Sequence, residues 1–192
     1  MMNPNACVIA TPSDQAIFNE EAFRKNVLEG LAFVAENNHF LTMGVKPTRP
    51  EPGYGYIQMG DVLCDNIYQV QSFTEKPERD FAKIFMESGE FYWNTGLFLS
   101  NVSYLRKCFC KILPPVLREY DKRYPEFSVE TENAYMKETF SSYPNISVDF
   151  GILEKPSNVC VMKCDFGWAD LGTWHSIYEA MQKGSNDNVI VD

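Results

Sequence analysis

Two aspartates that are far apart in the sequence stand where a ligand site of an α/β protein is expected. Asp14 directly follows the apolar run Ala6 to Ala10, and Asp170 lies in the stretch GWADLG, whose glycines permit close backbone approach. In open α/β sheets, ligands bind beyond the carboxyl ends of strands. Two carboxylates there could bind one Mg²⁺ ion, which takes one or two carboxylates together with waters and substrate phosphates. A turn role for Asp14 and a helix N-cap role for Asp170 are alternatives that the spacing leaves open.

Three further positions offer groups suited to a phosphorylated sugar. Glu75 and Lys76 end an apolar run, where lysine can contact a phosphate and glutamate can accept hydrogen bonds from hydroxyl groups. Gly55, in GYGYI, would let a substrate lie against the main chain. Asn94, in WNTG, offers both a donor and an acceptor beside a tryptophan that can stack on a pyranose. The alternatives are a surface ion pair at Glu75 and Lys76 and a simple loop role for Asn94.

The composition excludes several classes of protein. The chain has 192 residues, 45% of them hydrophobic, which predicts one globular domain spanning residues 1–192. The net charge of -9 opposes binding to nucleic acid, and no apolar run approaches the roughly 20 residues that span a bilayer. The six cysteines lack the paired spacing of a zinc site, and we expect small buried hydrophobic side chains in a cytoplasmic protein rather than metal ligands or disulfides.

The elements that must position these residues alternate between strands and helices, which predicts an α/β protein with a mixed, mostly parallel sheet flanked by helices. The expected strands are Ala6 to Ala10, Phe40 to Val45, Tyr54 to Met59, Tyr68 to Glu75, Thr95 to Leu99 and Val159 to Cys164. The expected helices are Asn19 to Asn37, Phe81 to Gly89, Val102 to Tyr124 with a break at Pro114, Thr131 to Phe140, Asp149 to Leu153 and Trp174 to Met181. We expect a rigid loop at Lys46 to Gly53 and a hairpin turn within Gly60 to Asn66.

Seven stretches together suggest a family. They are Asn3-Pro4, CVIATPSDQAI, MGVKPTRPEPGYGYI, FTEKP, SGEFYWNTGLFL, SVDFGILEK and FGWADLGTW, which span nearly the whole chain. In this order the stretches resemble the sugar nucleotidyltransferases, and most closely the mannose-1-phosphate guanylyltransferases. The resemblance implies a Rossmann-like nucleotide-diphospho-sugar transferase fold.

The resemblance also implies a reaction and roles for residues. In that family, an oxygen of the sugar 1-phosphate attacks the α-phosphorus of a nucleoside triphosphate, and Mg²⁺ offsets the developing charge while pyrophosphate leaves. By motif match, Asp14 and Asp170 would bind the metal and Lys76 would contact the sugar phosphate, and these three are the catalytic candidates. The candidates for hexose binding are Gly55, Glu75, Asn94 and Thr95.

The chain departs from the family pattern at several points. Gln15 stands where the family usually has histidine, and Pro52 where it has threonine. Nothing in the 192 residues matches the family's glycine-rich GxGTRLxPLS loop, so the resemblance implies a fold that is incomplete at its N-terminus. We therefore expect mannose-1-phosphate as a partner, GTP only if the missing segment is supplied, and little activity of this chain alone.

Two alternatives remain from the sequence. One is a non-catalytic module for sugar-phosphate binding or assembly, and the other is a nucleotidyltransferase acting on glucose-1-phosphate. In either case the strand Ala6 to Ala10 is expected to form an exposed sheet edge, through which we expect a homo-oligomer to form.

Overall fold

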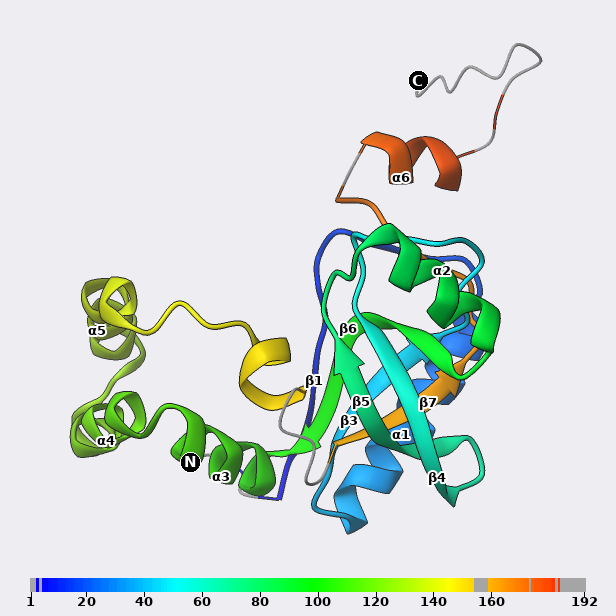
Figure 1. Cartoon of the computed structure of the whole chain (residues 1–192). Coiled ribbons are helices and arrows are strands. Elements are labelled where there is room, and N and C mark those ends of the chain that lie inside the picture. The colour runs from blue at the N-terminus through cyan, green and yellow to red at the C-terminus, as the bar shows by residue number, and fades with distance from the viewer. Residues whose placement is uncertain (1–2, 4, 154–158, 173, 182, 184–192) are drawn as a thin grey trace.

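The computed structural model describes residues 3, 5–153, 159–172, 174–181 and 183, which form a curved mixed sheet flanked by helices (Figure 1). The strands are β1 (Cys7–Ala10), β2 (Gln15–Ile17), β3 (Phe40–Val45), β4 (Tyr56–Cys64), β5 (Ile67–Thr74), β6 (Phe91–Asn101), β7 (Val159–Cys164) and β8 (Trp168–Asp170). The helices are α1 (Glu20–Glu36), α2 (Arg79–Ser88), α3 (Val102–Ile112), α4 (Pro114–Arg123), α5 (Val129–Thr139) and α6 (Trp174–Ala180), with short turns η1 (Tyr124–Glu126), η2 (Phe140–Ser142) and η3 (Asp149–Leu153). The expected α/β alternation is confirmed.

The large sheet has the strand order β1-β6-β3-β7-β5-β4, and β6 also pairs with β4. Five strands therefore form a ring of pairings, and β1 lies outside it as an edge strand. The pairing of β3 with β7 is parallel, and the other pairings in this sheet are antiparallel. The mixed sheet is confirmed, but the expected predominance of parallel pairing is wrong. Strands β1, β3, β4 and β7 run in one direction, and β5 and β6 run in the opposite direction. Because β5 and β6 lie between most of the other strands, only β3 and β7 are parallel neighbours.

Helix α1 begins and ends where the sequence predicts. The side chain of Asn19 accepts a hydrogen bond from the amide of Ala22, which satisfies one of the free donors of the first turn. Two glutamates, Glu20 and Glu21, occupy that turn, where negative charge is favourable because of the helix dipole. Strand β2 and helix α1 together connect β1 to β3, which run in the same direction because each is antiparallel to β6.

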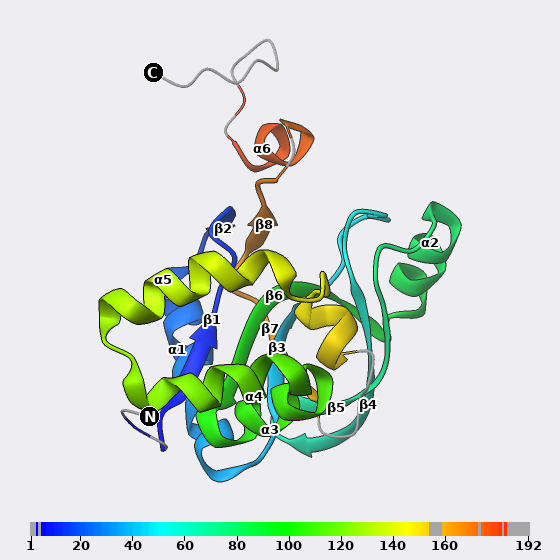
Figure 2. The same cartoon turned by 90° about the vertical axis from the view of Figure 1, so that its left-hand side faces the viewer.

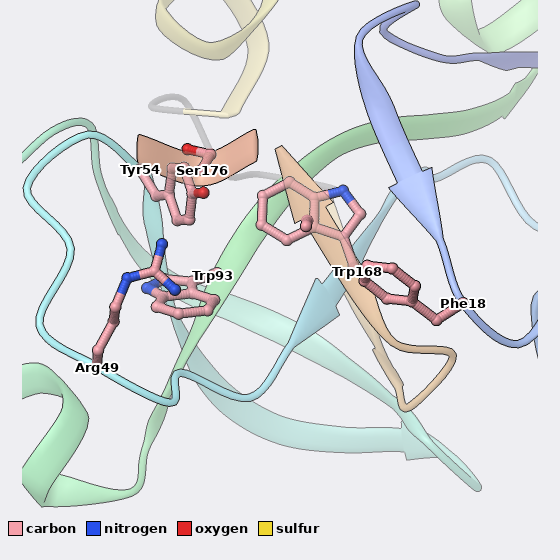
Figure 3. A pocket seen from close by; sticks show the side chains of 7 residues that line it. Phe18, Arg49, Tyr54, Trp93, Trp168 and Ser176 are labelled. Atoms are coloured by element: carbon pink, nitrogen blue, oxygen red, sulfur yellow. The ribbon is translucent and has the colours of Figure 1, made fainter. Parts of the chain in front are cut away.

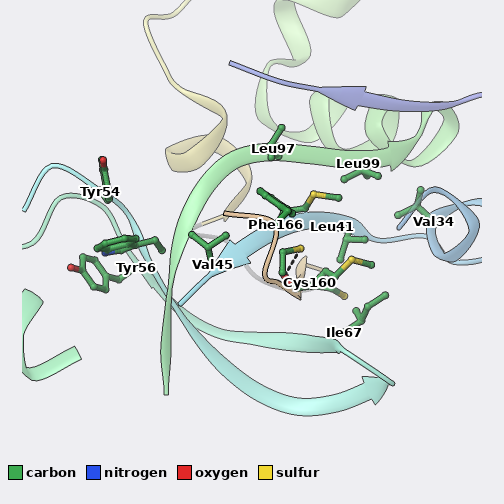
Figure 4. Packing of buried hydrophobic residues seen from close by; sticks show 14 of the residues in the cluster. Val34, Leu41, Val45, Tyr54, Tyr56, Ile67, Leu97, Leu99, Cys160 and Phe166 are labelled. Carbon is green, nitrogen blue, oxygen red and sulfur yellow. Dashed lines mark hydrogen bonds between the residues drawn. The ribbon is translucent and has the colours of Figure 1, made fainter. Parts of the chain in front are cut away.

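Two hydrophobic clusters fill opposite faces of the sheet. The first, shown in Figure 4, lies against α1 and α2 and includes Tyr54, Tyr56 and Trp93. The second lies against α3 and η3 and includes Ile57 and Ile152. Successive side chains of a strand point to opposite faces, so β3, β4, β5, β6 and β7 each contribute to both clusters. The helices are needed on both sides because both faces of the sheet are apolar.

The hairpin of β4 and β5 is longer than the sequence predicts. Cys64 pairs directly with Ile67, which leaves only Asp65 and Asn66 in the turn instead of the expected stretch from Gly60 to Asn66. Asp65 has a φ of 35°, in the region that tight two-residue turns require. The register shifts three times between Gln58 and Cys64, and these irregularities hide the alternation of a regular strand.

The cysteines occupy several environments, and none forms a disulfide. Cys160 and Cys164 are buried, and burial raises the pKa of both thiols to about 12. These two match the expected role as small hydrophobic side chains. Cys64 and Cys110 are exposed, so for them the expectation of burial is wrong.

No described helix combines the length and apolar character needed to cross a membrane.

The edge of the sheet at β1 is exposed, as expected. Ile9 is 37% exposed, and Ala10 is exposed as well.

Beyond α3, helices α4 and α5 extend away from the sheet (Figures 1 and 2). Helix α4 contains no fully buried residue and contributes none to the two clusters, whereas α3 packs on the second cluster with partly buried side chains.

Candidate functional site

Asp14 and Asp170 are brought together by two short strands that the sequence did not reveal. Strand β2 pairs with β8 in antiparallel orientation, with Gln15 opposite Asp170, and Figure 2 shows the two strands side by side beneath α6. The amide of Leu171 donates to the carbonyl oxygen of Asp14 at 2.8 Å. This pairing places the two aspartates next to each other although they lie near opposite ends of the sequence.

Both carboxylates lie beside Gly172. A Cβ atom on this glycine would lie 2.9 Å from Oδ1 of Asp170 and 3.6 Å from Oδ2 of Asp14, so both oxygens lie within a few ångströms of one point. The Gly172 amide donates to Oδ1 of Asp170 at 2.6 Å and fixes that carboxylate. Two carboxylates leave most of a cation's coordination to waters and phosphate oxygens, which is the arrangement that magnesium favours. The residues present therefore fit Mg²⁺.

The loop that carries Asp14 packs on the WNTG motif. Nε2 of Gln15 donates to the carbonyl oxygen of Thr95 at 2.5 Å. Cγ of Pro12 lies 3.1 Å from where a Cβ of Gly96 would be, and Gly96 has a φ of 73° that favours glycine. Gln15, the departure from the family's usual histidine, thus positions this loop against β6.

The side chain of Thr95 is buried and connects β6 to β3. Its side chain is 1% exposed, and its hydroxyl group donates to the carbonyl oxygen of Met43 at 2.8 Å. The hydroxyl therefore has no exposed surface with which to contact a ligand. Hexose binding by Thr95 stays a prediction from its position in the motif.

The side chain of Asn94 connects three segments. Its Oδ1 accepts a hydrogen bond from the hydroxyl group of Thr42 at 2.9 Å, and its Nδ2 donates to Oδ1 of Asp149 at 2.8 Å. The backbone amide of Asn94 donates to the carbonyl oxygen of Gly55 at 2.8 Å. Asp149, in η3, was not among the site residues expected from the sequence, although it lies in the stretch SVDFGILEK.

Gly55 and Glu75 are in direct contact. A Cβ on Gly55 would lie 2.6 Å from Oε2 of Glu75 and 3.0 Å from the ring of Phe73, so only glycine leaves room for the carboxylate. Glu75 is 16% exposed in its side chain and forms a 3.4 Å ion pair with Lys76, whose side chain is 65% exposed. Gly55 therefore leaves room for the Glu75 carboxylate, and contact of its backbone with the hexose stays a prediction.

Lys76 has an unusual backbone conformation. Its φ of 47° lies in the left-handed region, which few residues other than glycine adopt, and Pro77 follows it directly. Such a conformation costs about 1–3 kcal/mol and persists only where the surrounding structure enforces it. This conformation places the exposed ammonium group of Lys76 just beyond the end of β5.

The expected site residues form a chain of direct contacts. Asp170 and Asp14 meet at Gly172, Gln15 bonds to Thr95, the neighbour Asn94 bonds to Gly55, and Gly55 touches Glu75 beside Lys76. The sequence placed these residues in five separate stretches, and the structure brings all of them to one region. Among the described residues of this contact chain, carboxylates outnumber cationic groups, since Asp14, Asp149, Asp170 and Glu75 accompany a single lysine, Lys76. An anionic ligand would need a bound cation here.

Comparisons with known proteins show the family and support the fold. The nucleotidyl transferase family model matches residues 5–187. Mannose-1-phosphate guanylyltransferase of Sinorhizobium fredii is 33% identical over 97% of this chain and 36% of the relative, and that of Escherichia coli is 31% identical over 98% and 41%. The solved structure of a Thermus thermophilus protein described as mannose-1-phosphate geranyltransferase matches with a TM-score of 0.78 and 28% identity, over 90% of this chain and 49% of that one. The chain thus spans less than half the length of these proteins.

The hydrogen bond between Thr42 and Asn94 should be measurable in stability. We expect the substitutions Thr42→Val and Asn94→Ala to show a coupling of about 0.5–1.5 kcal/mol in a double-mutant cycle, because Thr42 is fully buried and each substitution removes the same bond. Urea denaturation gives the four stabilities. The control combines Thr42→Val with Ser142→Ala in η2, which should be additive. Additivity of the Thr42 and Asn94 substitutions would contradict this account.

Proposed function

The chain belongs to the nucleotidyl transferase family, and we propose that it provides the sugar-phosphate and metal part of a mannose-1-phosphate guanylyltransferase site. The proposed reaction converts GTP and mannose-1-phosphate into GDP-mannose and pyrophosphate. One observation supports the proposal above all others, namely the meeting of Asp14 and Asp170 at Gly172. The names of the relatives support the choice of mannose and guanine.

Each residue has a proposed task in binding. Asp14 and Asp170 would bind Mg²⁺, which neutralises phosphate oxygens and so lowers the repulsion in a region rich in carboxylates. Lys76 would contact the sugar phosphate, since its ammonium group is exposed beside the site. Glu75 and Asn94 would form hydrogen bonds with hexose hydroxyls, and Asp149, bonded to Asn94, would orient the amide.

Binding of mannose-1-phosphate should require both the metal and Asp170. We expect calorimetry to show saturable binding with Mg²⁺ and none after chelation with EDTA, because the carboxylates repel the phosphate without a cation. Asp170→Asn should weaken binding by at least about tenfold. This is the lower end of the loss of metal affinity seen when a residue that only supports a metal ligand is changed. Asp165→Asn is the matched control, because Asp165 is exposed and lies in the same segment.

Three results of this titration would count against the proposal. Equal affinity of the Asp170→Asn and Asp165→Asn variants would remove Asp170 from the metal site. Tighter binding of glucose-1-phosphate than of mannose-1-phosphate would favour the alternative sugar. Absence of any binding by a folded chain would leave neither form of the proposal standing.

We expect this 192-residue chain on its own to form no GDP-mannose. The reason is that its sequence contains no glycine-rich loop of the GxGTR type, whose amides and arginine would contact the triphosphate, and loss of one such donor alone costs about 3–4 kcal/mol of transition-state stabilisation. The assay measures GDP-mannose and pyrophosphate after incubation with GTP, Mg²⁺ and mannose-1-phosphate. The Escherichia coli relative serves as the positive control. Turnover by the purified chain would show that the residues described here suffice for nucleotide binding.

We also propose that the chain self-associates through the edge of β1. Its backbone groups on one side have no neighbouring strand within the described sheet, and Ile9 is partly exposed there. Light scattering should show a dimer or larger species that Ile9→Lys converts to a monomer. Ile84→Lys, on an exposed residue of α2, is the control and should leave the mass unchanged. A monomeric unmodified chain at all concentrations would exclude this association.

A further inference from the structure

Lys163 was not among the site residues expected from the sequence, but it lies on the same face of the sheet as Asn94. In β7, Lys163 pairs with Gly44 of β3, and Gly44 pairs in turn with Asn94 of β6. Directly paired residues of neighbouring strands point to one face, so only a glycine separates the lysine side chain from the Asn94 amide. Trp93 points to the other face, where its ring lines the pocket shown in Figure 3.

Two tyrosines hold the ammonium group of Lys163. Its Nζ donates a hydrogen bond to the hydroxyl oxygen of Tyr68 at 3.0 Å. The same atom lies 4.1 Å from the ring centroid of Tyr68 and 5.7 Å from that of Tyr92. Aromatic rings attract a cation through their electron-rich faces, so both contacts are favourable. Tyr92 precedes Asn94 by two positions in β6, which places the ammonium group beside the part of the strand that carries the amide.

Gly44 makes this arrangement possible. A Cβ atom at this position would lie 2.8 Å from Cγ2 of Val161 and 3.1 Å from Cβ of Tyr92. Gly44 has no positive φ, so backbone conformation does not require glycine here. A larger residue would displace Tyr92, which contacts the ammonium group, or Val161, which lies two positions before Lys163 in β7. The side chains of β6 and β7 thus approach each other across β3 because position 44 has no side chain.

The positive charge of Lys163 has no carboxylate partner among the described residues. No ion pair between residues that the structure describes includes Lys163. Its side chain is partly buried, and an ammonium group withdrawn from water is costly unless an anion compensates for the lost hydration. The hydrogen bond to Tyr68 uses one of its three donors. Two donors and an uncompensated charge are therefore left for an anionic ligand.

Lys76 differs from Lys163 in both respects. Its side chain is 65% exposed, and its ammonium group already pairs with Glu75 at 3.4 Å. Water and salt screen an exposed charge of this kind strongly. A phosphate close to Asn94 would gain more from the partly buried ammonium group of Lys163, because electrostatic attraction is stronger where less water surrounds the charges.

We propose that Lys163 is a second cationic contact for the sugar phosphate, and that it donates to a phosphate oxygen while Asn94 binds the hexose. The inference rests on the proposed function and adds to it a residue from outside the stretches that resemble the family. Lys163 lies between SVDFGILEK and FGWADLGTW, in the part of β7 that belongs to neither. Its charge offsets part of the repulsion from the carboxylates of the site, and the metal offsets the rest.

Calorimetry with mannose-1-phosphate and Mg²⁺ tests this contact. Lys163→Met removes the charge and keeps most of the apolar stem, so we expect binding at least about tenfold weaker, as for the loss of a hydrogen bond to a charged group. Lys83→Met, on an exposed lysine of α2, is the matched control and should leave the affinity unchanged. Added salt should weaken binding by the unmodified chain more than binding by Lys163→Met, because the variant lacks one charge contact. A merely structural role of Lys163 would not change this salt dependence.

Chemical modification of the unmodified chain gives a second measurement that does not depend on the folding of a variant. Mannose-1-phosphate with Mg²⁺ should slow the acetylation of Lys163 by acetic anhydride severalfold, whereas Lys83 should react at the same rate, as measured by mass spectrometry of peptides. Equal affinity of Lys163→Met and Lys83→Met, or acetylation of Lys163 that the ligand does not slow, would overturn this inference and leave the proposed function standing. Absence of binding by the unmodified chain would overturn both.

Discussion

The amide group of Asn94 is the interaction on which the candidate site depends most. It binds the hydroxyl group of Thr42 in β3 and the carboxylate of Asp149 in η3, while the backbone of the same residue bonds to Gly55, which directly precedes β4. These partners come from segments that are 39 to 55 positions away in the sequence. Without the amide, a buried hydroxyl would lose its acceptor and η3 would lose its polar contact with the sheet. The position of η3 over the second cluster and the geometry of the site are therefore linked through one side chain.

Electrostatics decides which ligands this arrangement can accept. Asp14, Asp149, Asp170 and Glu75 lie along the contact chain, and Lys76 already pairs with Glu75. The net charge of the whole chain, -9, adds to the local excess of negative charge. A phosphate can approach only if a cation compensates for the repulsion.

The sequence predicts the long elements well and the short ones poorly. β3 and β7 were predicted at their observed ends, because continuous apolar runs bounded by polar residues are typical of buried strands. β2 and β8 have three residues each, too few for a periodic pattern, and they exist only because they pair with each other. The mostly parallel pairing was wrong because β6 enters between β1 and β3, which no local pattern reveals. Motif order pointed to Asp14 and Asp170, but only their pairing through β2 and β8 shows that they meet.

Two glycines show why the motifs contain the residues that they do. Neither Gly55 nor Gly172 has a positive φ, so backbone conformation does not require glycine at either position. In both cases the space of a Cβ is needed by a carboxylate, from Glu75 at Gly55 and from Asp170 at Gly172. An alanine would move these acidic groups rather than distort a turn. The carboxylates of Glu75 and Asp170 thus require glycine at positions 55 and 172. The same carboxylates make the site negatively charged, so that a phosphate ligand would need a bound cation. Glycine motifs and carboxylates therefore belong to one arrangement in this sequence.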